Sequence, residues 1–514
     1  MTEEIPRIDK LKAMRAASKL GGGQDRIDKQ HAKGSLTARE RIDLLLDKGS
    51  FREIGAMTTA LDDPNGDSGL GDGVVTGYGQ VDGRTTYVYA QDFTVQGGSL
   101  GKMHADKICR VMDLAVKTGS PIIGMIDSGG ARIQEGVYSL GGYAEIFRRN
   151  AIYSGVVPQI SLIMGPCAGG ASYSPAVTDL IIMVRKQSYM FLTGPAVIKT
   201  VTGEDVDFET LGGADVHLTT SGTCHMVGAD EREAIALARQ ALSYFPSNNA
   251  EKPPLAETND KINRRSEMLN TIVPEDPNQP YSMKDAINQI MDTGSFLEIL
   301  AGYAPNAIVG LARLAGRPVG VVSQEPAMMA GVMDINSADK IARMVRMCDA
   351  FNIPVVTFVD SPGFLPGVHQ EHGGVIRHGA KVLFAYSEAT VPKVSVVTRK
   401  AYGGAYVVMS SKYLGTDITY AWPSAEIAVM GAEGAANILY GRQIKAADDP
   451  QAERERLTQQ YQEEFLNPYA AAKAGYIDEV IEPAETRQKL IEALQAIENK
   501  VEINPARKHG NMPV

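Results

Sequence analysis

Two short glycine-rich segments hold the residues best suited to do chemistry. Gly169-Gly170-Ala171 follows an apolar stretch and precedes helix-compatible sequence, and so does Gly403-Gly404-Ala405. Because glycine has no Cβ, backbone N–H groups at such turns can converge on one point, where a helix N-terminus adds positive potential. An oxyanion hole is built in this way, and one donor typically stabilises a transition state by about 3–4 kcal/mol. We therefore expect these six residues to act through their backbone amides.

A single turn of this type would more often serve only close packing, but this chain is duplicated. From Gly77 to Gly130, identical residues recur at an offset of 233 positions, beginning with Gly77 and Gly310. Further matches are Gly83-Arg84 with Gly316-Arg317, Ala105-Asp106-Lys107-Ile108 with Ala338-Asp339-Lys340-Ile341, Pro121 with Pro354, and Asp127-Ser128 with Asp360-Ser361. The two Gly-Gly-Ala segments match at an offset of 234. The same turn at equivalent places of two repeats favours catalysis over packing.

The duplication predicts two domains, residues 1–260 and 270–514. The stretch between them, 246–281, is rich in Pro, Asn, Asp, Glu and Lys, which is typical of a surface connection. In each repeat a hairpin, turning at Asp82-Gly83 or Ala315-Gly316, precedes an amphipathic helix, a buried strand, and a strand leading into Gly-Gly-Ala. This order predicts a layered α/β fold in which helices cover the sheets.

The composition argues against several classes of protein. Of the 514 residues, 44% are hydrophobic and 22% charged, which is ordinary globular usage. A net charge of −10 argues against a nucleic-acid partner, and an anionic ligand would need a local basic patch. The four cysteines and eight histidines show no metal-ligand spacing, so no metal site is expected. Because neither a signal peptide nor a membrane-length apolar run is visible, we expect a cytoplasmic protein.

Longer motifs surround the two turns and carry a family resemblance. They include Asp127 to Gly136 (DSGGARIQEG), Asp360 to Gly367 (DSPGFLPG) and Arg399 to Tyr406 (RKAYGGAY). From about residue 20 onward the chain resembles the biotin-dependent acyl-CoA carboxyltransferase family, which includes propionyl-CoA carboxylase β subunits, methylmalonyl-CoA decarboxylase α subunits and the central transcarboxylase subunit. The resemblance implies two duplicated crotonase-like (ClpP/crotonase) β-β-α superhelix domains. It also implies carboxyl transfer between carboxybiotin and the α-carbon of a short acyl-CoA, with propionyl-CoA and methylmalonyl-CoA as the expected pair.

The resemblance assigns a role to each candidate residue. The turn Gly169-Gly170-Ala171 would face the acyl thioester, and Gly403-Gly404-Ala405 would face biotin, so that each repeat stabilises one developing negative charge. Gly129-Gly130-Ala131 would help hold the CoA side. Arg132 would either reach a phosphate or form a structural salt bridge. Val407 stands where propionyl-CoA carboxylases commonly carry Asp, at a place associated with acyl-chain selection, which weakens a strictly propionyl assignment.

The resemblance also implies partners. The chain contains no biotinyl Met-Lys-Met motif and no ATP-grasp domain. We therefore expect a separate biotin carrier protein, together with either a biotin carboxylase subunit or membrane decarboxylase subunits, and a homohexameric assembly. The sequence does not choose among a carboxylase, a sodium-pumping decarboxylase and a transcarboxylase.

One further motif is compatible with a different class of function. Gly97-Gly98-Ser99-Leu100-Gly101 matches the nucleophile elbow of serine hydrolases. The second repeat has Val332 at the position of Ser99, so no nucleophile recurs there. A crotonase-like thioester hydrolase or hydratase without a biotin partner is accordingly the less favoured alternative.

Overall fold

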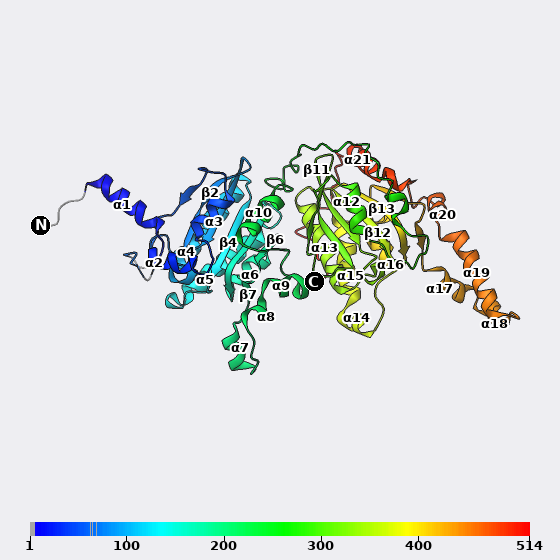
Figure 1. Cartoon of the computed structure of the whole chain (residues 1–514), viewed down its shortest axis with the longest axis horizontal. Helices are drawn as coiled ribbons and strands as arrows, with labels where there is room; N and C mark the ends of the chain where they lie inside the picture. Colours follow the sequence, from blue (N-terminus) through cyan, green and yellow to red (C-terminus); the bar gives the residue numbers. More distant parts are fainter. Residues whose placement is uncertain (1–5, 62, 64, 68) are drawn as a thin grey trace. The chain divides into compact units, whose positions relative to one another are not determined.

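The computed structural model describes residues 6–61, 63, 65–67 and 69–514. The chain forms two compact units, Met1–Glu251 and Lys252–Val514, which are shown in Figure 1. The expected boundary after residue 260 differs from this division. Residues 252–260 group with the second unit, in which the Ala256 N–H donates to the carbonyl of Gly316 at 3.0 Å.

The first unit contains one mixed sheet in the order β1-β2-β3-β4-β5-β6-β8, with β7 paired to β5. The strands β1, β2 and β3 pair antiparallel, and those from β3 onward pair parallel. The strands are β1 (Arg52–Ile54), β2 (Val74–Val81), β3 (Arg84–Gln91), β4 (Ile122–Ser128), β5 (Gln159–Ala168), β6 (Leu180–Val184), β7 (Tyr189–Phe191) and β8 (Met226–Gly228). The helices are α1 (Arg7–Lys19), α2 (Gln24–His31), α3 (Ala38–Leu45), α4 (Lys102–Thr118), α5 (Val137–Tyr153), α6 (Gly170–Ala176), α7 (Pro195–Val201), α8 (Phe208–Gly212), α9 (Ala214–Val216) and α10 (Glu231–Leu242).

The second unit repeats this architecture, with the order β16-β14-β13-β12-β11-β10-β9 and β15 paired to β13. Its strands are β9 (Leu297–Ile299), β10 (Ala307–Leu314), β11 (Arg317–Gln324), β12 (Val355–Ser361), β13 (Lys393–Tyr402), β14 (Ile418–Ala421), β15 (Glu426–Ala428) and β16 (Glu479–Val480). Its helices are α11 (Leu269–Ile272), α12 (Met283–Ile290), α13 (Ile335–Ala350), α14 (Val368–Gly373), α15 (Val375–Glu388), α16 (Gly403–Val408), α17 (Ala432–Leu439), α18 (Gly441–Ala446), α19 (Pro450–Phe465), α20 (Pro468–Lys473) and α21 (Thr486–Ala496).

Both predicted hairpins are confirmed, and both turn in the same way. Asp82 and Gly83 have φ of 49° and 78°, and Ala315 and Gly316 have φ of 50° and 77°. Two consecutive positive φ values are typical of a type I′ turn, whose twist matches that of the flanking strands. In the first unit, the Asp47 carboxylate accepts from the N–H groups of the turn at 3.2 and 2.9 Å.

An equivalent aspartate supports the turn of the second unit. Asp292 accepts from the N–H groups of Ala315 and Gly316 at 3.0 and 2.7 Å. Asp47 and Asp292 are separated by 245 positions and begin the related segments DKGSFREI and DTGSFLEI. The repeat therefore begins before Gly77, which the constant offset of 233 did not show.

The strands that lead into the Gly-Gly-Ala turns are long and change partner along their length. β5 pairs first with β6 and then, through Pro166 to Ala168, with β7. Its pairing with β4 shifts register between Ile126 and Ser128. β13 does the same with β14 and β15, and its pairing with β12 shifts between Val359 and Ser361. Each change of partner carries a Gly-Gly-Ala turn beyond the end of the main sheet.

The predicted apolar faces of α4 and α13 are buried in the cores of the two units. On α4 the buried positions include Ile108, Val111, Met112 and Ala115, and on α13 their counterparts are Ile341, Met344, Val345 and Cys348.

Within the described part of the chain, no helix has both the length and the apolar character needed to cross a membrane.

Candidate functional site

The first Gly-Gly-Ala turn closes the junction of β5 and α6. Gly169 has a φ of 58°, and its N–H donates to the carbonyl of Phe191 at 3.0 Å, which ties the turn to β7. Gly170 and Ala171 are the first residues of α6, so their N–H groups have no carbonyl to meet within the helix. A Cβ on Gly170 would lie only 2.9 Å from the ring of Tyr143. The turn thus leaves two adjacent amides available, in a setting that admits only glycine at its centre.

The second turn has the same backbone course but more open surroundings. Gly403 has a φ of 55°, and a Cβ there would lie 3.0 Å from the carbonyl oxygen of Val429. Gly404 is exposed, and a Cβ on it would meet no described atom within 4 Å. Ala405 follows on α16 and is buried. As in the first repeat, the leading amides of a short helix are without intrahelical acceptors.

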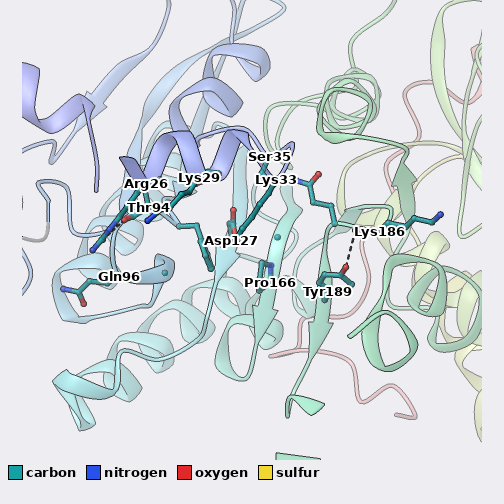
Figure 2. A pocket seen from close by; sticks show the side chains of 15 residues that line it. Arg26, Lys29, Lys33, Ser35, Thr94, Gln96, Asp127, Pro166, Lys186 and Tyr189 are labelled. Atoms are coloured by element: carbon teal, nitrogen blue, oxygen red, sulfur yellow. Dashed lines mark hydrogen bonds between the residues drawn. The ribbon is translucent and has the colours of Figure 1, made fainter. Parts of the chain in front are cut away.

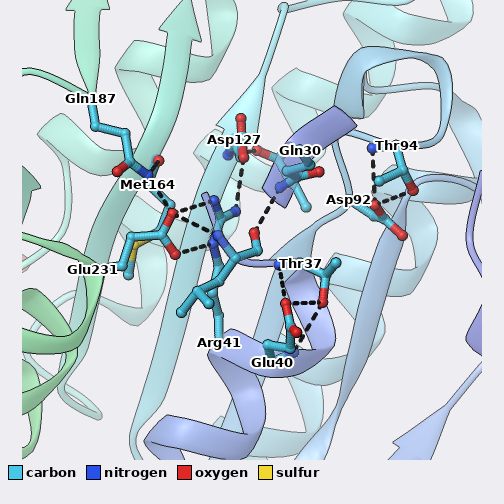
Figure 3. A network of polar contacts seen from close by, with 12 residues as sticks. Gln30, Thr37, Glu40, Arg41, Asp92, Thr94, Asp127, Met164, Gln187 and Glu231 are labelled. Carbon is cyan, nitrogen blue, oxygen red and sulfur yellow. Dashed lines mark hydrogen bonds and ion pairs between the residues drawn. The ribbon is translucent and has the colours of Figure 1, made fainter. Parts of the chain in front are cut away.

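A buried aspartate lies behind each turn, and the two repeats pair it with different arginines. At the end of β4, Asp127 Oδ2 is 2.8 Å from Nη1 of Arg41, whose Nε is also 2.8 Å from Glu231 Oε2 (Figure 3). Burial raises the pKa of Asp127, and the charge of Arg41 opposes that rise. At the end of β12, Asp360 is instead paired with Arg399, at 3.0 Å from its Nε.

The aspartate of the first repeat is paired with an arginine from a different element than in the second repeat, and this leaves space next to Asp127. Gly165 stands where the second repeat has Arg399, at the offset of 234, and a Cβ on Gly165 would lie 2.2 Å from Asp127 Oδ1. Because Arg41 approaches Asp127 from α3, the position on β5 needs no side chain. The space in front of Gly165 and Pro166 is therefore left open as part of a cavity.

This cavity in the first unit has a volume of about 660 Å³ and a basic rim. Figure 2 shows Arg26 and Lys29 on α2, Lys33 on the segment after it, and Lys186 beyond the end of β6. All four side chains are exposed. Among the described lining residues the one carboxylate is Asp127, which is already paired with Arg41. The cavity is the local basic patch that an anionic ligand would need in a chain of net charge −10.

The glycine-rich loop after β4 lies between this cavity and the first turn. The Gly129 N–H donates to the carbonyl of Gly97, a cavity-lining residue, at 3.1 Å. A Cβ on Gly130 would lie 3.1 Å from the carbonyl oxygen of Ala168, the residue before Gly169. The structure thus brings together the loop and the turn that the sequence placed in one site.

Arg132 takes the second of its two predicted roles. It is 1% exposed, with Nη1 at 2.6 Å from Asp72 Oδ1 and 2.8 Å from Glu135 Oε1. Its Nη2 donates to the carbonyl of Ser99 at 2.9 Å. The buried guanidinium therefore stabilises the loop through these contacts, and the predicted phosphate contact is not supported.

The other side chains of the site include no evident nucleophile. Ser99 Oγ donates to the carbonyl of Gln96 at 2.8 Å, an ordinary local contact. Burial raises the pKa of the Cys167 thiol to about 12, so this thiol is not ionised at neutral pH and is a poor nucleophile. Val407 is 46% exposed on α16, two residues after Ala405. No group of His, Cys, Asp and Glu among the described residues could hold a metal ion.

Comparison with known proteins decides the family. A model of the carboxyl transferase domain matches residues 29–512. The chain belongs to the carboxyl transferase domain family. The carboxyltransferase subunit of propionyl-CoA carboxylase from Haloferax mediterranei is 56% identical over 99% of both chains. The α subunit of methylmalonyl-CoA decarboxylase from Propionigenium modestum is 52% identical over the full length of both.

Solved structures of this carboxyl transferase family confirm the fold. The transcarboxylase 12S subunit matches with a TM-score of 0.97 and 50% identity over 100% of both chains. That protein was solved as a hexamer assembly with methylmalonyl-coenzyme A and methylmalonic acid bound. The prediction of two duplicated crotonase-like α/β domains is therefore confirmed. The basic cavity, by contrast, was missed in the sequence, where its charges are scattered over residues 26–33 and position 186.

Proposed function

We propose that this chain is the carboxyltransferase subunit of a biotin-dependent acyl-CoA carboxylase, with propionyl-CoA and methylmalonyl-CoA as the acyl pair. The observation that carries the proposal is the doubled Gly-Gly-Ala turn, which offers unpaired amides at equivalent places of two repeats. A carboxyl transfer between biotin and a thioester develops negative charge on two oxygens. Two oxyanion holes match that requirement, whereas hydrolysis or hydration of a thioester requires only one.

Each turn has a role in this proposal. As the α-carbon becomes carbanion-like, the thioester oxygen gains charge, and the amides of Gly170 and Ala171 donate to it. The N–H of Gly169, the third predicted donor, stays bonded to the carbonyl of Phe191 and positions the turn. Biotin, when bound, supplies the carboxyl group and a second oxygen that gains charge. The amides of Gly403, Gly404 and Ala405 face that oxygen, and the open space beside Gly404 leaves room for a ligand. The proposal requires no side-chain acid or base.

The basic cavity suits the remainder of the thioester. Coenzyme A carries several phosphate charges, and Arg26, Lys29, Lys33 and Lys186 supply cations around one cavity. The loop Gly129-Gly130-Ala131 joins this cavity to the first turn, as expected of a path for the pantetheine arm. We propose Val407 as a contact that influences acyl size, supported by its exposure beside the second turn.

We further propose a homohexamer that works with a separate biotin carrier protein and a biotin carboxylase subunit in the cytoplasm. The solved 12S relative assembles as a hexamer, and the four cysteines of this chain are free thiols, as is usual in a reducing compartment. The alternative is the α subunit of a sodium-pumping decarboxylase, and the 52% identity to the α subunit of a methylmalonyl-CoA decarboxylase favours it. That alternative predicts no ATP requirement in the native complex and co-purification with membrane subunits.

Carboxyl transfer to free biotin tests the proposal. Purified protein is incubated with biotin and methylmalonyl-CoA labelled in the free carboxyl group, and label in the biotin fraction or in CO2 is counted. We expect label release that depends on biotin. Inactivity with both methylmalonyl-CoA and malonyl-CoA, or biotin-independent turnover of a simple acyl-CoA, would contradict the proposal.

A further inference from the structure

The first Gly-Gly-Ala turn is held in place by a serine. Ser172, two residues after Gly170, has its Oγ 2.7 Å from the carbonyl oxygen of Cys167 and 3.0 Å from that of Phe191. Cys167 is the next-to-last residue of β5 and Phe191 the last residue of β7, so one hydroxyl bridges the ends of both strands. Together with the bond from the Gly169 N–H to Phe191, this contact fixes the direction in which the turn leaves the sheet.

The second turn lacks this contact. At the offset of 234 the counterpart of Ser172 is Tyr406, whose side chain is much longer. Tyr406 is 7% exposed, and its hydroxyl has no hydrogen-bond partner among the described residues. Because its hydroxyl makes no such contact, Tyr406 does not bridge the ends of two strands. The second turn must therefore be held by other groups.

In the second repeat, a tyrosine and a glutamate connect the strands β13 and β15. Tyr402, the last residue of β13, donates from its hydroxyl to Oε2 of Glu426, the first residue of β15. The counterparts in the first repeat are Ala168, which has no donor, and Tyr189, whose hydroxyl donates to the carbonyl of Lys186 at 3.2 Å. The link is thus a feature of the second repeat alone.

The residues that follow β15 pack against the same turn. The carbonyl oxygen of Val429 lies 3.0 Å from where a Cβ on Gly403 would stand. A Cβ on Gly431 would be 3.5 Å from the ring of Tyr402. Any movement of β15 relative to β13 therefore changes the support of Gly403, and the bond between Tyr402 and Glu426 opposes that movement.

We propose that Tyr402 and Glu426 are the positioning residues of the second turn and do there what Ser172 does in the first. This inference rests on the proposed function, in which the second turn serves the biotin side of the transfer. Burial and the neighbouring Glu426 carboxylate raise the pKa of Tyr402 well above its ordinary value, so the hydroxyl stays a donor at physiological pH. The bond also occupies a carboxylate that would otherwise lie uncompensated near a site of developing negative charge.

Activity measurements on matched variants test the pair. Tyr402→Phe should lower kcat for carboxyl transfer to free biotin by about 3- to 10-fold, the range that one lost hydrogen bond predicts. The KM for methylmalonyl-CoA should stay within twofold, because the first turn and its cavity are untouched. Glu426→Gln keeps an acceptor and should restrict the loss, whereas Glu426→Ala should match Tyr402→Phe. Combining Tyr402→Phe with Glu426→Ala should add nothing further if both act through one bond.

The control is Tyr420→Phe, which removes a tyrosine hydroxyl on β14 that donates to the carbonyl of Lys489 at 3.4 Å, and it should leave kcat unchanged. Hydrogen exchange of the peptide spanning residues 399–410 gives a second readout that needs no activity. It should speed up in Tyr402→Phe and not in Tyr420→Phe. Wild-type kcat and wild-type exchange in Tyr402→Phe would overturn the inference. A wild-type protein that transfers no carboxyl group would overturn the proposed function instead, and the exchange result would then decide whether the pair holds the turn.

Discussion

Replacing Gly404 with alanine separates catalysis from folding more cleanly than any other change at the site. The added Cβ meets no described atom within 4 Å, and Gly404 does not have a positive φ. In a helical residue, exchanging glycine for alanine stabilises a protein by up to about 1 kcal/mol. The variant should therefore melt at or slightly above the temperature of the wild type.

Its activity should fall sharply all the same, because the methyl group projects into the space proposed for the reacting oxygen. Loss of one oxyanion donor typically lowers kcat by about 10²–10³-fold. The assay is transfer of labelled carboxyl from methylmalonyl-CoA to free biotin, together with a thermal melt of the same sample. Wild-type kcat in a folded Gly404→Ala variant would refute the assignment of this turn.

The equivalent change in the first repeat gives a contrasting control. A Cβ on Gly170 would press against the Tyr143 ring at 2.9 Å, so Gly170→Ala should lose both activity and stability. Overpacking of this kind costs about 1–3 kcal/mol. If Gly170→Ala were as stable as Gly404→Ala, the surroundings described for the two turns would be wrong.

Three further outcomes are expected. Lys29→Glu with Lys33→Glu should raise the KM for methylmalonyl-CoA by about tenfold or more with little change in kcat, and the effect should shrink in high salt because exposed charges are screened. Arg41→Met should destabilise the fold by about 3–5 kcal/mol, because it leaves the carboxylates of Asp127 and Glu231 buried without their cation. That loss should diminish as the pH falls from 7 toward 4. Burial raises the pKa of the Asp127 carboxyl above its value in the unfolded chain, so in this pH range the folded variant binds a proton that the unfolded variant does not. Ser99→Ala should retain nearly full activity, measured by the same transfer assay.

Each of these outcomes has a control or a contrary result. Lys10→Glu changes a lysine on α1 outside the cavity and should leave KM unaltered. The loss of stability in Arg41→Met is measured by chemical denaturation at several pH values. A loss that stayed constant from pH 7 to pH 4 would show that the variant does not leave the buried Asp127 carboxylate without a cation. Abolished activity in Ser99→Ala would favour the hydrolase alternative.

The sequence predicted the parts of this structure that depend on short-range patterns and on repetition. Alternating apolar residues and paired turn residues identified both hairpins, and the repeat, at an offset of 234 in this part of the chain, aligned the two Gly-Gly-Ala turns. It did not predict how charges are shared across long distances. Arg41 pairs with Asp127 and Glu231, 86 and 190 residues away, and neither partner could be identified from spacing.

The basic cavity and Arg132 show the same limit. The cavity gathers cations from α2 and from the end of β6, which only the folded sheet brings together. Arg132 lies in a motif whose glycines suggest a ligand site, yet its own side chain turns inward to Asp72 and Glu135. A sequence motif identifies where the backbone must be free of side chains, but the direction of a long side chain depends on the charges that burial forces it to meet.

The central claim is that one turn from each repeat serves a single transfer, and we propose that the two turns belong to different subunits of the homohexamer. It is tested most directly by co-expressing Gly170→Ala and Gly404→Ala chains with different tags and isolating assemblies that contain both. Each variant alone should be inactive. A mixed pair of subunits retains one site with two intact turns, so random association should restore about one quarter of wild-type carboxyl transfer. Mixed assemblies that stay as inactive as the single variants would contradict the account.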